Sequence, residues 1–183
     1  VSRALMVAYA TNDAGRREII GFDVYEEESR RTWTDFLQGL KERGLVSPLM
    51  ITSDAHKGML HAIAKVYPLC PWQRCQFHFA RNILDGVPKQ YETAVSDKLR
   101  ELFTCDTIGK ARKKKEEIIE EYEPVAEKAM KCLDDGFESA MTVMILPNWI
   151  RKYFRTSNHL ERLNREIKRR ANIIGIFPNE ESI

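Results

Sequence analysis

The sequence lacks any long apolar run, and it has few cysteines. No stretch approaches the ~20 apolar residues that a membrane helix needs, and the amino terminus does not join a basic start to an apolar stretch. The four cysteines are widely scattered: Cys70, Cys75, Cys105 and Cys132. Nothing in this pattern suggests secretion or a disulfide framework, so we expect a protein of the reducing cytoplasm without membrane spans.

The chain also lacks a strong overall charge, because its formal net charge is only +2. Its 183 residues are 43% hydrophobic, which suffices for one core of ordinary size, with room for an inserted subdomain. The basic residues gather late, with eight cations against Glu161 and Glu166 between positions 151 and 170. Such a segment suits contact with nucleic-acid phosphates, although a solvated helix face is the simpler alternative.

The first third of the chain predicts an α/β core. Residues 4–10 form an apolar run typical of a strand buried on both faces, and the alternation at Ile20, Phe22 and Val24 completes an antiparallel hairpin. A helix with Trp33, Phe36, Leu37 and Leu40 on one face ends at Gly44. A third strand is expected at 49–52 and a fourth at 72–79, running into a helix. Between them, a helix is expected to bury Met59, Leu60, Ile63, Ala64 and Tyr67.

Residues 88–146 have long helical periodicity, which predicts an all-helical insertion of roughly three helices with a stripe that includes Ile118, Tyr122 and Val125. The basic run 110–115 beside the acidic run 116–121 is most simply a solvated helix face. A last helix is expected over 158–170, with Leu160, Leu163, Ile167 and Ala171 as its apolar stripe.

Two carboxylates are candidates for metal chemistry. Asp54 follows the third strand, where open α/β sheets place ligands, and it suits Mg²⁺; it could equally cap the following helix. Glu161 lies beside the apolar stripe of the basic helix, but it could also close a capping box with Asn158 or pair with Arg165. Glu166 occupies the other flank, so periodicity does not choose between the two glutamates.

Cys75 and His78 have the spacing of half a zinc site, yet no second pair at ligand spacing completes it. If 72–79 is extended throughout, the two side chains point to opposite faces, whereas a helical turn would bring them together. A buried cysteine and a backbone-bonded histidine remain the alternative.

Three motifs spread over nearly the whole chain carry a family resemblance: ITSDAHKG at 51–58, WQRCQFHFARNIL at 72–84, and TSNHLERLNREIKRR at 156–170 followed by IIGIFPNEES at 173–182. Together they resemble the Mutator-type transposases of bacterial insertion sequences. The resemblance implies an RNase H-like mixed sheet flanked by helices, with core parts at 1–87 and 147–183 around a helical insertion at 88–146. It implies a catalytic Asp-Asp-Glu triad in which Asp54 is the second aspartate and Glu161, rather than Glu166, the glutamate. Cys75 and His78 match a family signature of unknown role.

The resemblance further implies Mg²⁺-dependent cleavage and strand transfer on double-stranded DNA, both terminal repeats and target, with Mn²⁺ as a substitute ion. Arg162, Arg165, Lys168, Arg169 and Arg170 would contact the DNA backbone. No residue matches the family's first aspartate, so the first strand is expected upstream of Val1 and residues 1–183 alone are expected to be inactive. A homo-oligomer on nucleoid DNA of a bacterium or archaeon is expected. The rival reading is a non-catalytic DNA-binding or assembly module derived from such an enzyme.

Overall fold

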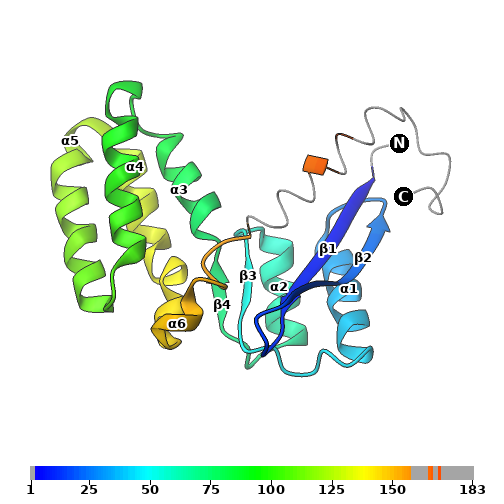
Figure 1. Cartoon of the computed structure of the whole chain (residues 1–183). Coiled ribbons are helices and arrows are strands. Elements are labelled where there is room, and N and C mark those ends of the chain that lie inside the picture. The colour runs from blue at the N-terminus through cyan, green and yellow to red at the C-terminus, as the bar shows by residue number, and fades with distance from the viewer. Residues whose placement is uncertain (1–2, 158–164, 167–168, 170–183) are drawn as a thin grey trace. The chain divides into compact units, whose positions relative to one another are not determined.

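The structure is a computed structural model that describes residues 3–157, 165–166 and 169 (Figure 1). The described residues fall into two compact units. The first unit contains residues 3–48, 56–70, 157, 165–166 and 169, and the second contains residues 49–55 and 71–156. Small sheets and many helices make this a mixed α/β protein, as the sequence predicts.

The first unit opens with the predicted hairpin. Strands β1 (Ala4–Thr11) and β2 (Arg17–Tyr25) pair antiparallel, with a register shift between Ala8 and Tyr9. The side chain of Asn12 accepts hydrogen bonds from the backbone N–H groups of Ala14 and Arg16, and Gly15 adopts a φ of 73°. Left-handed backbone is most accessible to glycine, so this loop fixes the reversal.

The prediction that the first strand is buried on both faces is wrong. Met6 is buried, but Ile19 and Phe22, which lie across from β1 residues, are 46% and 66% exposed. A side chain added at Gly21 would meet Leu40, so α1 covers the sheet face that carries Gly21. Within the described residues the sheet has two strands only, and its other face keeps apolar side chains at the surface.

Helices α1 (Arg30–Glu42) and α2 (Lys57–Val66) pack against each other in this unit. Ser29 and Thr32 form a capping box at the start of α1. Beyond its end, Gly44 adopts a φ of 110°, so the predicted glycine stop is confirmed. The predicted core residues of α1 are also confirmed by burial: Phe36, Leu37 and Leu40.

The apolar face predicted for α2 is only partly correct. Ile63 and Tyr67 are buried as expected, but Ala64 is exposed, and Ala62 and Val66 are buried instead. The Tyr67 hydroxyl donates a 2.9 Å hydrogen bond to the carbonyl oxygen of Leu45, and this contact anchors the end of α2. Packing against α1 therefore determines which face of α2 is buried, and the spacing of its apolar residues predicts that face only in part.

The second unit contains a pair of short parallel strands, β3 (Ile51–Ser53) and β4 (Trp72–Arg74). Strand β3 begins two residues later than predicted. Strand β4 is far shorter than the predicted run, because helix α3 (Gln76–Leu84) begins directly after Cys75. The N–H of Cys75 donates a 2.7 Å hydrogen bond to the carbonyl oxygen of Ser53, which aligns the carboxyl ends of the two strands.

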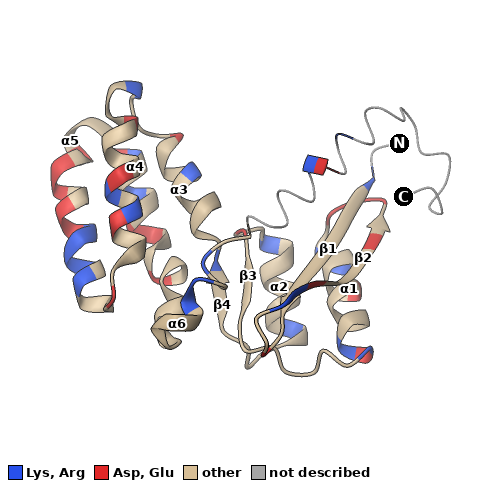
Figure 2. Ribbon diagram, viewed as in Figure 1, with Lys and Arg blue, Asp and Glu red and all other residues tan. Residues whose placement is uncertain are grey.

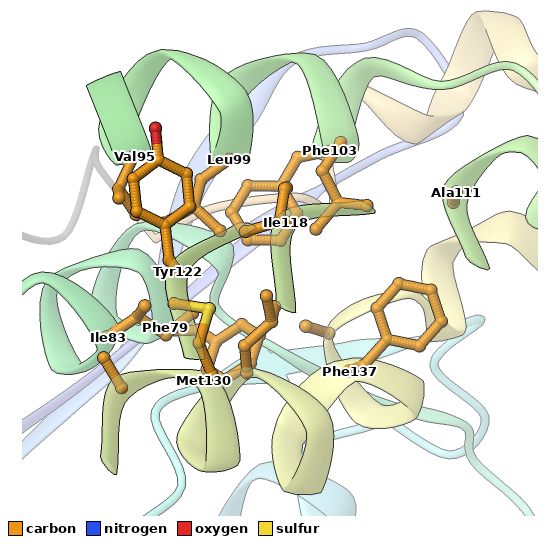
Figure 3. Packing of buried hydrophobic residues seen from close by; sticks show 14 of the residues in the cluster. Phe79, Ile83, Val95, Leu99, Phe103, Ala111, Ile118, Tyr122, Met130 and Phe137 are labelled. Atoms are coloured by element: carbon orange, nitrogen blue, oxygen red, sulfur yellow. The ribbon is translucent and has the colours of Figure 1, made fainter. Parts of the chain in front are cut away.

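The largest core of the second unit is helical. Helices α3, α4 (Lys89–Thr104) and α5 (Ile108–Ala140) surround a cluster of buried apolar side chains, shown in Figure 3. Phe79 from α3, Leu99 from α4 and Met130 from α5 are almost fully buried. Helix η1 (Thr142–Ile145) and helix α6 (Asn148–Arg151) follow.

Helix α5 consists of two limbs. Pro124 lies inside it, and Ala126 has the non-helical angles φ −147° and ψ 46°. Ion pairs from Arg112 to Glu138 and from Lys115 to Asp134 show that the limbs lie side by side. Together with α4, the two limbs of α5 make three helical segments, the number that the sequence predicts. Because the chain reverses here, Ala126 is buried and Val125, predicted in the core, is 43% exposed.

The charged run of α5 is a surface feature, as predicted, and it pairs more widely than expected. Lys113 pairs with Glu117 four residues on, whereas Lys114 pairs with Glu101 of α4. Figure 2 shows the basic and acidic residues of this run at opposite ends of the first limb of α5, beside charges of both signs on α4. These partners neutralise the run locally, so it does not form a free cationic surface. Across the part of the chain that the structure describes, no helix is long and apolar enough to cross a bilayer.

Candidate functional site

Asp54 follows β3 directly, at the carboxyl end of the parallel β3–β4 pair, and its side chain is exposed. The alternative that Asp54 caps the following helix is wrong, because the N-cap residue of α2 is His56. The carboxyl ends of parallel strands are where α/β proteins bind ligands. Asp54 thus keeps the position that metal chemistry would require.

The second predicted carboxylate, Glu161, lies outside the described residues. Its rival Glu166 is described and helical, and its two carboxylate oxygens accept hydrogen bonds of 2.8 and 2.9 Å from Arg169. This bidentate ion pair occupies both Glu166 and one of the predicted DNA contacts. Arg165 is described and exposed. The remaining predicted DNA contacts lie outside the described residues: Arg162, Lys168 and Arg170.

The chain that leads toward Glu161 is fastened beside the strand that leads to Asp54. The Thr52 hydroxyl donates a 2.8 Å hydrogen bond to the carbonyl oxygen of Phe154, and the N–H of Gln76 donates a 2.9 Å bond to that of Arg155. The Phe154 side chain packs on the small apolar cluster of Met50, Val143 and Leu146. Figure 1 shows this segment in orange near β3 and β4.

Cys75 and His78 lie in the helical arrangement that the sequence left open. Cys75 is the N-cap residue of α3 and is fully buried, while His78 lies in the first turn and is half-buried. Within the described residues no group of three His, Cys, Asp or Glu side chains is placed to hold a metal ion. The pair matches a family signature of unknown role, and the described residues assign it none.

Two buried glutamines near the site were not predicted from the sequence. Gln73 of β4 and Gln76 of α3 both donate to the carbonyl oxygen of Ala140, at 2.7 and 2.8 Å. The side-chain oxygen of Gln73 also accepts a 2.6 Å bond from the N–H of Val143. These bonds fasten the end of α5 to the strand pair that precedes Asp54. The signal in the sequence was two glutamines in a strand-to-helix segment rich in aromatic residues.

Arg151, counted among the late basic residues, has a structural task. It donates hydrogen bonds to the backbone carbonyl oxygens of Leu146, Asp106 and Met144, at 2.7, 2.8 and 3.1 Å. Its guanidinium therefore closes the turn around η1 and α6. This leaves less of the net positive charge of residues 151–170 available to a ligand than the sequence suggests.

Among the described residues, an exposed carboxylate thus stands at a strand end, beside a segment that two hydrogen bonds hold at the strand pair. The whole chain, residues 1–183, matches the family model described as "Transposase, Mutator family". The chain belongs to the Mutator family of transposases.

Curated relatives agree with this membership of the Mutator family. The chain is 41% identical over its full length to the transposase for insertion sequence element IS256 in transposon Tn4001 of Staphylococcus aureus, and covers 47% of that protein. It is 35% identical to the transposase for ISRM5 of Rhizobium meliloti, with 46% of that protein covered. The transposase for IS1081 of Mycobacterium tuberculosis is 30% identical over 97% of this chain, which covers 43% of it. The Mutator-family chain thus spans about half the length of these relatives.

Proposed function

We propose that this chain is part of a transposase catalytic domain that cleaves DNA strands and joins them to target DNA. One observation carries the proposal: the Thr52 and Gln76 hydrogen bonds hold Phe154 and Arg155 at the carboxyl ends of β3 and β4. Glu161 follows Arg155 by six residues, a reach of at most about 20 Å even if fully extended. We infer that Asp54 and Glu161 contribute to one site, as the family resemblance implies.

Mg²⁺, with Mn²⁺ as a substitute, is the ion that these residues suit, because both are carboxylates and hard cations bind oxygen. Asp54 offers an exposed oxygen ligand and Glu161 a second. The described residues hold no complete ligand set, so the third carboxylate would come from the first aspartate implied by the family. When bound, such ions neutralise phosphate charge and lower the pKa of a bound water.

The chain's own residues would position the reactants. Arg165 and Arg169, with Arg162, Lys168 and Arg170, would hold the DNA backbone so that a water, and later a 3′-hydroxyl, lies in line with the scissile phosphodiester. Arginine suits this task because its planar guanidinium binds phosphate oxygens in pairs. Arg169 would have to exchange its partner Glu166 for phosphate. The substrates would be terminal-repeat and target DNA, bound by a homo-oligomer in the cytoplasm, at the nucleoid.

The fold that accompanies this proposal is RNase H-like, with residues 88–146 as a helical insertion between core parts 1–87 and 147–183. Among the described residues each sheet has two strands, β1–β2 and β3–β4, so an RNase H-like sheet would require further strands.

The test uses the full-length transposase that contains this sequence, with Asp54→Asn, Glu161→Gln and Glu166→Gln as the matched control. Strand transfer of terminal-repeat DNA in Mg²⁺ is expected to fall by more than ~100-fold in the first two variants and to survive in the control. Circular dichroism should be unchanged in all three, and DNA binding should not fall in any of them. Full strand transfer by Glu161→Gln would overturn the assignment, and an inactive wild type that still binds DNA would favour the non-catalytic module.

A further inference from the structure

Arg155 carries a guanidinium that has no counter-charge among the described residues. The residue is half-buried, and its Nε atom is screened from solvent with no hydrogen-bond partner in the part of the chain that the structure describes. No carboxylate among the described residues forms an ion pair with it, whereas Arg151, four residues earlier, donates to three backbone carbonyls. Burial, together with the nearby charge of Arg151, lowers the pKa of Arg155.

The backbone of Arg155 is held in place, although the Nε atom of its side chain has no hydrogen-bond partner among the described residues. Its carbonyl oxygen accepts the hydrogen bond from Gln76 at the start of α3, and the preceding carbonyl accepts from Thr52 of β3. Asp54 lies two residues after Thr52, directly beyond the end of β3. Arg155 therefore belongs to the same end of the β3–β4 pair as the exposed carboxylate.

We propose that Arg155 is a phosphate-binding residue at this end of the strand pair. A partly desolvated cation without an anionic partner raises the free energy of the folded protein. Binding of an anion beside that cation therefore lowers the free energy. A phosphate diester suits the site because guanidinium binds two of its oxygens at once and is only weakly hydrated. That the phosphate belongs to DNA rests on the proposed function; that an anion binds here does not.

Lys152 provides the matched comparison within the same segment. It carries the same charge three residues away, but it is exposed and lies over the ring of its neighbour Tyr153, with 5.1 Å from Nζ to the ring centroid. Removing Lys152 deletes a solvated charge, whereas removing Arg155 deletes a desolvated one. The two variants separate a built phosphate site from general attraction between the segment and DNA.

The experiment compares full-length wild type with Arg155→Gln, Arg155→Lys and Lys152→Gln. Binding of a fluorescent terminal-repeat duplex is measured in EDTA over a salt series, and thermal unfolding is measured without DNA. We expect Arg155→Gln to reduce the slope of log affinity against log salt by about 0.9, the value for one phosphate contact. We expect Arg155→Lys to keep the slope but bind more weakly, and Lys152→Gln to change the slope less. The melting temperature of free Arg155→Gln should be unchanged or raised.

An unchanged slope in Arg155→Gln would overturn the proposal, as would an equal change in Lys152→Gln. A fall in the melting temperature of free Arg155→Gln would instead assign Arg155 to an internal ion pair, and would also overturn the proposal. Because EDTA removes metal chemistry, these readouts do not depend on catalysis. Failure of the Asp54 and Glu161 assignment would therefore appear in strand transfer while leaving the salt slope intact.

Discussion

The hydroxyl of Thr52 donates a 2.8 Å hydrogen bond to the carbonyl oxygen of Phe154, joining residues that are 102 positions apart in the chain. The neighbouring bond from Gln76 to Arg155 has the same effect one residue later. Together they fix where the chain returns to the strand pair after the long helical segment. Substitutions at these hydrogen bonds, and in the packing around them, should therefore change stability or activity measurably.

Replacing Thr52 by valine keeps the shape of the side chain but removes its hydroxyl. The carbonyl of Phe154 loses its donor, and we expect the free energy of unfolding to fall by about 1 kcal/mol. In the full-length protein, strand transfer should fall further than stability alone accounts for, because the segment leading to Glu161 is loosened. Denaturant unfolding and strand-transfer rates check this, with Thr52→Ser as the rescue; equal loss in both variants would contradict a role for the hydroxyl.

Replacing Gln73 by leucine removes a buried side chain that serves three backbone groups. The N–H of Val143 would lose its acceptor, while the carbonyl of Ala140 would retain its bond from Gln76. Leaving a buried donor unpaired costs about 1–3 kcal/mol, so a drop of that size in unfolding free energy is expected. Gln38→Leu, on the exposed surface of α1, is the control and should change stability little. Similar losses in the two variants would show that the buried bonds contribute nothing special.

Two glycines of α5 should respond in opposite ways to alanine. A Cβ at Gly136 would lie 2.6 Å from Nη1 of Arg74 and against the ring of Phe79, which Arg74 covers at 4.4 Å. Gly136→Ala is therefore expected to destabilise by about 1–3 kcal/mol through overpacking. Gly109 has nothing within 4 Å, so Gly109→Ala should be neutral or stabilise by up to about 1 kcal/mol. Thermal unfolding distinguishes them, and a stabilised Gly136→Ala would refute the packing at α3.

The helical segment should weaken in acid. Hydrogen bonds and charge attraction from Lys114 and Lys98 hold the pKa values of Glu101 and Glu121 below the usual glutamate value of 4.5. A carboxylate with a depressed folded-state pKa contributes stability above its unfolded pKa and loses it as the pH falls through the folded value. Melting temperature should therefore drop below about pH 4.5. The drop should be smaller in Glu101→Gln/Glu121→Gln and in high salt, which screens exposed pairs; an identical acid profile in the double variant would count against these pairs.

Much of the fold follows from local pattern. The hairpin turn at Gly15, the helix stop at Gly44 and the apolar stripe of α1 needed only turn chemistry and period to be predicted. The wrong predictions concern residues whose burial depends on contacts with other helices. Spacing predicts Val125 in the core, but the chain reversal at Ala126 leaves it exposed. In α2, the face that packs on α1 buries Ala62 in place of Ala64.

The candidate site divides in the same way. Sequence placed Asp54 after a strand, and the structure excluded its capping role by making His56 the N-cap. Glu161 was selected over Glu166 by family resemblance, and it stays a prediction because it lies outside the described residues. Gln73, Gln76 and Arg155 were not predicted as site-supporting residues, because polar side chains in an amphipathic segment look alike until their partners are known.

By itself the sequence determined the family, the mixed α/β class and the position of Asp54 at a strand end, since motifs and hydrophobic period are properties of neighbouring residues. Only the tertiary structure decided that Phe154 returns to Thr52, that Arg151 is committed to backbone carbonyls, and that Arg155 is left without an ion-pair partner among the described residues. Hydrogen bonds across a hundred residues and the desolvation of a charge depend on which groups meet in space, and no local pattern records that.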